Sequence, residues 1–244
     1  MRYIFISPHL DVIALSCGGI VNHLATKKHD VLIWTIFSGS PQSFELSEFA
    51  QSLHKRWNLP LDAPKIRRKE DKLACKVLES KIMHFGIPDC IYRKDNNGDP
   101  IVKKEEDLYQ QIPASQLFLV NQIFRKFQKI INSDDIVVSP LAIGDHLDHR
   151  ITKAAIQKFS NHKMLFYEDY PYVMKSNNKH SNLPDFDPIY FHLDDENIRK
   201  WHTAISQYRS QISTFWKSEN HMKNEIIDFF NKGGGSNLWK LIEN

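Results

Sequence analysis

Hydrophobic and polar residues alternate along the chain in blocks typical of a protein that mixes helices and strands. Short apolar, β-branched runs at residues 2–7, 29–38, 81–87, 134–141 and 163–169 predict buried strands. The stretches between them place apolar residues at helical spacing, which predicts helices at 12–28, 65–80, 116–131 and 149–160. Regular alternation of this kind favours an α/β fold with three layers, in which helices cover both faces of a mostly parallel sheet.

The pattern is less regular in the segments outside these blocks. Residues 38–64 predict a loop with one short helix, and residues 92–104 carry turn residues that predict an exposed excursion. From about residue 171 we expect a loop to 184, a strand at 189–193, and helices at 195–211 and 220–232, ended by three glycines. Because no clear linker interrupts the chain, we expect one domain over residues 1–244.

Composition narrows the classes of function. The net charge of +3, from 32 basic and 29 acidic residues, gives no case for nucleic-acid binding. The sequence also lacks the roughly 18–20 consecutive apolar residues of a membrane helix, so we expect a cytoplasmic protein without a membrane span. Three cysteines without a C-x-x-C pair predict buried, reduced thiols rather than disulfides or a sulfur-ligated metal.

Two segments at predicted strand ends are rich in the side chains that bind metals and move protons. The sequence SPHLD follows the first strand, and SPLAIGDHLDHR follows the fourth. In open α/β sheets, ligands bind outside the carboxyl ends of the strands. We therefore expect these two loops to lie beside a ligand site. Catalytic zinc takes about three protein ligands, mainly histidines and carboxylates, and makes a bound water more acidic.

The residue types in these loops suit hydrolysis of an amide. A carboxylate near a metal can take a proton from water, and a histidine can stabilise the oxyanion or protonate the leaving amine. A second acid can orient that histidine. With 12 histidines in the chain, some are expected near acids by chance. Taken alone, His9 is better interpreted as a structural residue than as a catalytic one. Both loops together favour a functional site.

The order of motifs resembles the LmbE-like, or PIG-L-type, N-acetylglucosaminyl de-N-acetylase family. SPHLDVIALSCGG resembles its first motif and GDHLDHR its second, His-x-Asp-His. IRRKEDKLACKVL is similar to an Arg-x-x-Glu helix of the family, and KWHTAISQYRSQ to a late helix. The matches run from about residue 3 to 211. The resemblance implies a Rossmann-like α/β fold and a divalent metal, usually zinc, that serves to hydrolyse acetamido sugars.

The resemblance also implies a role for each matching residue. His9 and His149 would be metal ligands, and Asp11 would be the general base. His146 would be the acid or the oxyanion partner, and Asp148 would be the carboxylate that orients it. These roles are expectations that depend on the match of the two motifs.

Arg67 and Arg68 begin the helix that the family places beside its site. The resemblance implies that they contact a polar or anionic part of the substrate, because arginine makes paired hydrogen bonds to carboxylates and phosphates. A solvated surface position for both arginines remains a close competitor.

Val12 departs from the family, whose first motif has a second aspartate as metal ligand at that position. Valine has no lone pair for a metal. Three outcomes are open. His9 and His149 bind the ion with water or substrate, another acid such as Asp145 or Asp11 replaces the ligand, or the site is empty.

Two functions follow from these alternatives. One is a metal-dependent deacetylase of an N-acetylated sugar or conjugate, impaired by Val12. The other is a protein of the same family that binds a carbohydrate-type ligand without hydrolysis. A dinucleotide-binding enzyme would need a glycine-rich turn after the first strand, where SPHLD stands instead. The sequence does not specify the sugar or the oligomeric state.

Overall fold

A single sheet of seven strands runs through the part of the chain that the computed structural model describes, which omits residues 44, 160–161, 176–182 and 243–244. The strand order is β3-β2-β1-β4-β5-β7-β6. Strands β1 to β5 are parallel, whereas β7 is antiparallel to both β5 and β6. The strands are β1 (Arg2–Ser7), β2 (Asp30–Thr35), β3 (Lys81–His84), β4 (Ile136–Pro140), β5 (Lys163–Tyr167), β6 (Phe186–Tyr190) and β7 (Asn237–Leu241). The predicted α/β fold with a mostly parallel sheet is confirmed.

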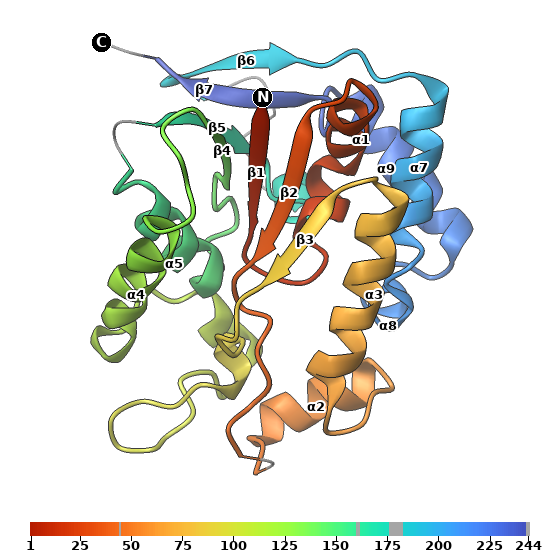
Figure 1. The fold of residues 1–244 in the computed structure, drawn as a ribbon. Coiled ribbons are helices and arrows are strands. Elements are labelled where there is room, and N and C mark those ends of the chain that lie inside the picture. The colour runs from red at the N-terminus through yellow and green to blue at the C-terminus, as the bar shows by residue number, and fades with distance from the viewer. Residues whose placement is uncertain (44, 160–161, 176–182, 243–244) are drawn as a thin grey trace.

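Helices cover both faces of this sheet (Figure 1). One face carries α1 (Val12–Thr26), α3 (Ala63–Val77), α7 (Asp195–Ile205), α8 (Arg209–Phe215) and α9 (Glu219–Asn231). The other carries α4 (Leu117–Phe127) and α5 (Leu147–Ile156). Two shorter helices, α2 (Glu48–Arg56) and α6 (Tyr172–Lys175), lie in connecting segments, as do the 3-10 turns Cys90–Tyr92, Glu105–Tyr109 and Ala114–Gln116.

The first strand shows why an unbroken apolar run folds here as a central strand. Successive side chains of a strand point to opposite faces of the sheet. Tyr3 and Phe5 pack in the hydrophobic cluster with α1 and α7, whereas Ile4 and Ile6 pack in the cluster with α4 and α5. Because both faces are buried, apolar residues are favoured at every position of the strand.

Helices α1 and α7 approach each other closely at two glycines. A Cβ atom built on Gly18 would lie 2.7 Å from Cδ1 of Trp201, and one on Gly19 would lie 2.7 Å from Cδ1 of Leu193. The indole Nε1 of Trp201 donates a hydrogen bond to the carbonyl of Ala14 at 2.6 Å. The Gly-Gly pair of the first motif therefore makes room for a fully buried tryptophan.

Helix α3 buries a polar face, which differs from the pattern read from the sequence. Apolar spacing predicts that Leu73 faces the core, but its side chain is 51% exposed. The buried face instead includes Arg67, Glu70 and Asp71. Glu70 accepts hydrogen bonds from the backbone N–H and hydroxyl of Ser210, so it satisfies groups at the start of α8.

Three further expectations differ from the structure. The segment 92–104 is only partly exposed, because Val102 and Arg93 are buried. The helix expected over 195–211 is divided at Tyr208, whose hydroxyl donates to Asp71. The strand expected at 189–193 lies at 186–190. A further strand, β7, forms beyond the three glycines.

The cysteines agree with the expectation from composition. The three cysteines are free and buried, and burial raises the pKa of each thiol. Among the described residues, none of the helices has the length and apolar character needed to cross a bilayer. The expected loop over 170–184 lies partly outside the described residues, and within it Tyr172–Lys175 is helical.

Replacing Gly18 by alanine tests the close contact between α1 and α7. Alanine favours helix by up to about 1 kcal/mol over glycine, but an extra methyl in a packed core costs about 1–3 kcal/mol. We expect Gly18→Ala to lower the free energy of unfolding in urea. Gly86→Ala is the control, because its Cβ would meet no atom of the described residues within 4 Å. Equal stability of both variants and the parent would contradict the contact.

Candidate active site

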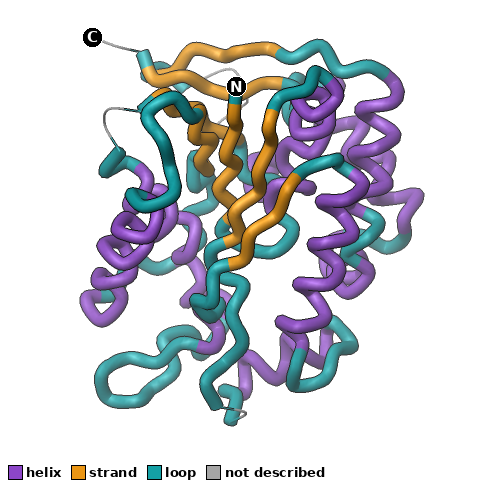
Figure 2. Tube along the Cα trace, in the orientation of Figure 1, coloured by secondary structure: helices purple, strands orange, loops and turns teal. Residues whose placement is uncertain are grey.

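The loops that follow β1, β3, β4 and β5 gather at one end of the sheet (Figures 1 and 2). They surround a cavity of about 170 Å³. Residues from α2, α3 and α8 complete its wall. The polar lining consists of His9, Asp11, Arg56, Arg67, Asp89, Glu105, His146, His149, Gln211 and Thr214, and the apolar and aromatic lining includes Val12, Trp57, Tyr109, Tyr170, Tyr172 and Phe215.

The loop after β1 holds Asp11 in an unusual backbone conformation. Asp11 has φ 151° and stands directly before α1. A non-glycine residue in a sparsely populated region costs on the order of 1–3 kcal/mol, and such residues cluster at functional sites. Two hydrogen bonds to the carbonyl of His9 support the turn, from the Asp11 N–H (3.1 Å) and from the Ser7 hydroxyl (2.6 Å).

The Asp11 carboxyl is buried beside Arg67, whose Nη2 lies 3.3 Å from Oδ2. Burial raises the pKa of Asp11 to about 6, the positive charge of Arg67 opposes this rise, and the nearby Asp71 adds to it. A carboxyl in this setting exchanges a proton more readily near neutral pH than an exposed one does.

His9 faces two carboxylates. Its Nδ1 lies 3.1 Å from Oδ2 of Asp89, and its Nε2 lies 3.6 Å from Oδ2 of Asp148. Burial lowers the pKa of His9, but the charges of these two aspartates outweigh burial, and the net direction is upward. Neither ring nitrogen has a partner with hydrogen-bond geometry among the described residues.

His146 caps the N-terminus of α5. Its Nδ1 accepts a hydrogen bond from the backbone N–H of Asp148 at 3.3 Å, so the proton of the neutral ring is assigned to Nε2. Burial lowers the pKa of His146 well below its usual value, and the neighbouring His9 and His149 lower it further. His146 is therefore neutral around pH 7, with one N–H to donate.

Asp148 and His149 each bind a partner that the sequence did not indicate. The Asp148 carboxylate accepts hydrogen bonds from Arg93 (2.5 Å) and from the backbone N–H of Cys90 (3.0 Å). Asp148 thus contacts His146 through its backbone, while its carboxylate is held by the 88–93 segment. The Nδ1 of His149 lies 2.5 Å from Oδ1 of the buried Asp169, which orients its ring.

Five predicted site residues, His9, Asp11, His146, Asp148 and His149, lie together at these strand ends. Arg67 also lines the cavity, whereas Arg68 is directed to the loop after β2, where it donates to the carbonyl of Ser38 at 2.6 Å. Asp145, considered as a replacement ligand, is paired with Arg150 at the surface (2.8 Å, 63% exposed side chain).

Sequence reasoning missed Asp89, Arg93 and Asp169. Asp89 follows β3, so its place at a third strand end was an available signal. Asp169 follows the end of β5 by two residues, so its place at a strand end was a similar signal. Nothing in the local sequence marked Arg93, which sits in a segment expected to be exposed.

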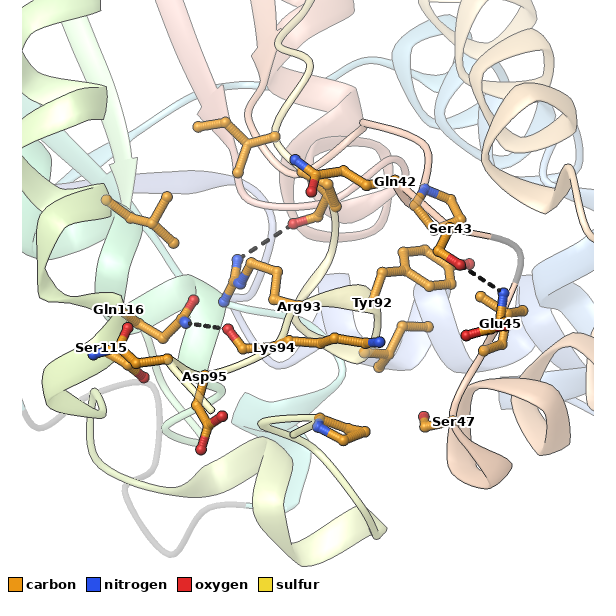
Figure 3. Close-up of a pocket in the computed structure, with 18 of the residues that line it drawn as sticks. Gln42, Ser43, Glu45, Ser47, Tyr92, Arg93, Lys94, Asp95, Ser115 and Gln116 are labelled. Carbon is orange, nitrogen blue, oxygen red and sulfur yellow. Dashed lines mark hydrogen bonds between the residues drawn. The ribbon is translucent and has the colours of Figure 1, made fainter. Parts of the chain in front are cut away.

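A second and larger cavity, of about 620 Å³, is lined in part by the 88–95 segment (Figure 3). In it Gln116 donates from Nε2 to the carbonyl of Lys94 (3.2 Å), and Arg93 donates to the carbonyl of Pro88 (3.3 Å). These bonds fix the segment from which Asp89 and Arg93 enter the site.

The donor atoms fit a divalent metal. Ligand atoms of His9, His146 and His149 lie within 4.8 Å of one another, and so do those of His9, Asp89 and Asp148. Imidazole nitrogens with carboxylate oxygens are the usual set for catalytic zinc. The ring nitrogens of His9 are buried, face carboxylates and make no hydrogen bond among the described residues. This arrangement of nitrogen and oxygen donors suits a cation between them.

Comparison with known proteins gives the family. The chain matches the GlcNAc-PI de-N-acetylase (PIG-L) family over residues 4–160. It is 32% identical over 198 residues to 2'-N-acetylparomamine deacetylase of Niallia circulans, covering 72% of this chain and 69% of the relative. The protein therefore belongs to the GlcNAc-PI de-N-acetylase family.

Solved structures agree with this assignment. The zinc-inhibited form of teicoplanin deacetylase Orf2 is 28% identical and superposes with a TM-score of 0.84, covering 100% of this chain and 99% of that one. N,N'-diacetylchitobiose deacetylase from Pyrococcus horikoshii shares the fold at 17% identity and a TM-score of 0.57, covering 99% and 83% of the two chains. The relative and the solved structure with more than 25% identity to this chain are thus both deacetylases.

Replacing Arg93 by methionine tests the buried ion pair with Asp148. Removing one partner of a buried pair leaves an uncompensated charge and typically costs about 3–5 kcal/mol. We expect Arg93→Met to lower the free energy of unfolding by that amount in urea titrations. Arg150→Met is the control, because its partner Asp145 is exposed and such pairs contribute at most about 1 kcal/mol. Similar losses for both variants would contradict the strength assigned to this pair.

Proposed function

We propose that the protein is a divalent-metal-dependent hydrolase that removes the acetyl group from an N-acetylated sugar or sugar conjugate. The observation that carries the proposal is the meeting of Asp11, His146 and two metal-type histidines around one cavity, in a chain of a de-N-acetylase family. In keeping with the sequence, we expect the protein to act in the cytoplasm.

The metal is held by His9 and His149 in this proposal, and zinc is the ion that the donor set favours. When bound, the ion polarises the acetyl carbonyl and makes a water more acidic. Asp169 supports this assignment, because its bond to Nδ1 of His149 leaves Nε2 of that ring available to the ion.

Asp11 acts as the general base that takes a proton from the attacking water. Its carboxyl is buried in the cavity wall, and Arg67 stabilises the ionised form. A nearby cation also lowers the pKa of Asp11, so the carboxylate is available near neutral pH. The proton can then pass to the departing amine, which leaves the free amino sugar and acetate.

His146 stabilises the oxyanion that develops on the acetyl oxygen. Its tautomer carries the proton on Nε2, and its low pKa keeps the ring neutral. A nearby cation lowers this pKa further, so the direction does not depend on metal loading. A preorganised neutral N–H suits an oxyanion partner better than it suits a general acid.

The size and lining of the cavity suit the reacting end of a sugar. At about 170 Å³ it is smaller than the roughly 300–1,000 Å³ of sites that enclose a whole ligand. Trp57, Tyr109 and Tyr172 offer aromatic faces to an apolar ring face, and Arg67 offers N–H groups for hydroxyls. The remainder of a conjugate then lies outside the cavity.

Asp11→Asn tests the general base. Loss of a positioned base typically lowers a rate by about 10²–10⁴-fold. We expect this fall in acetate release when the zinc-loaded protein is incubated with a panel of N-acetylated amino sugars. Asp145→Asn serves as control and retains the parent rate, because that carboxylate pairs with Arg150 at the surface. Parent-like acetate release by Asp11→Asn would contradict the assigned role.

A second function is favoured by one residue. Val12 lines the cavity as the first residue of α1, and its side chain offers the metal no ligand. On this observation, the alternative is a protein that binds an N-acetylated sugar without hydrolysing it.

Val12→Asp separates the two functions. If the protein is a hydrolase, the parent already takes up about one zinc per chain and releases acetate, and the variant only binds zinc more tightly. If it is a binding protein, the parent does neither and the variant gains both. Elemental analysis and acetate assays give the answer, with Val12→Asn as a control that adds polarity without a carboxylate.

A further inference from the structure

The question left by Val12 is which carboxylate completes the metal site, and two candidates lie beside His9. Asp89 and Asp148 each bring an Oδ2 atom to within 4 Å of a different ring nitrogen, at 3.1 and 3.6 Å. With His9 they form a donor group whose ligand atoms all lie within 4.8 Å of one another.

Asp148 is committed to other partners. Its side chain is fully buried, its Oδ1 accepts from Arg93, and its Oδ2 accepts from the Cys90 N–H. A guanidinium charge already balances this carboxylate. Moving it to a metal would leave Arg93 unpaired in the interior, which is costly.

Asp89 has one oxygen in hydrogen bonds to its own turn and one that faces His9. Its Oδ1 accepts hydrogen bonds from the Ile91 N–H at 3.2 Å and from the Cys90 thiol, which fixes the carboxylate at the start of a 3-10 turn. Its Oδ2 is directed to Nδ1 of His9, and its side chain lines the catalytic cavity. The geometry therefore leaves Asp89 Oδ2 with His9 Nδ1 as its partner and with no arginine or backbone donor bound to it among the described residues.

We propose that Asp89 supplies the carboxylate ligand that Val12 cannot, so that His9 Nδ1 and Asp89 Oδ2 bind the same divalent ion. Two ligands about 2.1 Å from a tetrahedral zinc lie roughly 3.4 Å apart, close to the separation found here. This inference rests on the proposed metal dependence, and it moves the acidic ligand from the first motif to the loop after β3.

Zinc affinity of the full-length protein tests the proposal without an activity readout. The chain is stripped with a chelator and titrated with zinc in competition with a chromophoric chelator. We expect Asp89→Asn to weaken zinc binding by more than about 100-fold, beyond the 10–100-fold typical of a lost outer partner. Asparagine retains an oxygen for the Ile91 N–H, so the turn is kept. Asp145→Asn, its control, binds zinc like the parent.

A rescue variant and an absorption spectrum separate the loss of a metal ligand from a loss of zinc affinity caused by misfolding. Val12→Asp in the Asp89→Asn background restores a carboxylate to the wall of the same cavity, and we expect zinc affinity to return. With cobalt in place of zinc, visible absorption of Asp89→Asn differs from that of the parent, whereas Asp145→Asn leaves it unchanged. Circular dichroism of the metal-free proteins confirms that each variant is folded.

The outcomes distinguish this proposal from the proposed function. A loss of zinc affinity in Asp89→Asn of about 100-fold or less overturns the ligand, since an outer partner of His9 accounts for a loss of that size, while acetate release by the parent still supports a hydrolase. Zinc binding that depends on Asp89 without acetate release supports the ligand and rejects hydrolysis. A folded parent that binds no zinc overturns the ligand and the metal-dependent hydrolase together.

Discussion

The geometry of the site depends on the buried carboxylate of Asp148. An ionised group removed from water must be paired and hydrogen-bonded, and Arg93 and the Cys90 N–H satisfy both requirements. These bonds tie the loop after β3 to the first turn of α5. Because Oδ2 of Asp148 also faces His9, one carboxylate links three strand-end loops. The residues that share the cavity are held together by a pair that itself need not react.

A second polar network joins α3 to the C-terminal helices, so residues of the α3 motif also stabilise the fold. Arg67 approaches Asp11 at 3.3 Å, while Glu70, one turn further on, receives two hydrogen bonds from Ser210. The same helix face thus positions the base and fixes the start of α8. Substitutions on this face are therefore expected to change stability and site geometry together.

The periodicity of apolar residues predicted the strands β1 to β5 and the main helices, and the two motifs predicted the loops that form the site. They failed where partners come from elements distant along the chain. Leu73 is exposed because the inner face of α3 meets polar groups, which no apolar spacing announces. Arg93 is buried because its counter-charge, Asp148, lies far along the chain. The roles of the individual site residues and the single-domain boundary stay predictions.

Charge balance accounts for how a valine can stand at position 12. The carboxylates of Asp11 and Asp148 each have an arginine within ion-pair distance, whereas Asp89 faces His9. A cation at His9 would balance Asp89 without a further acid. A second unpaired aspartate at position 12 would add negative charge to a small, buried cavity. If Asp89 is the ligand, the metal site still has one carboxylate without an aspartate at position 12. The apolar Val12 then avoids a second negative charge that the cation would not balance.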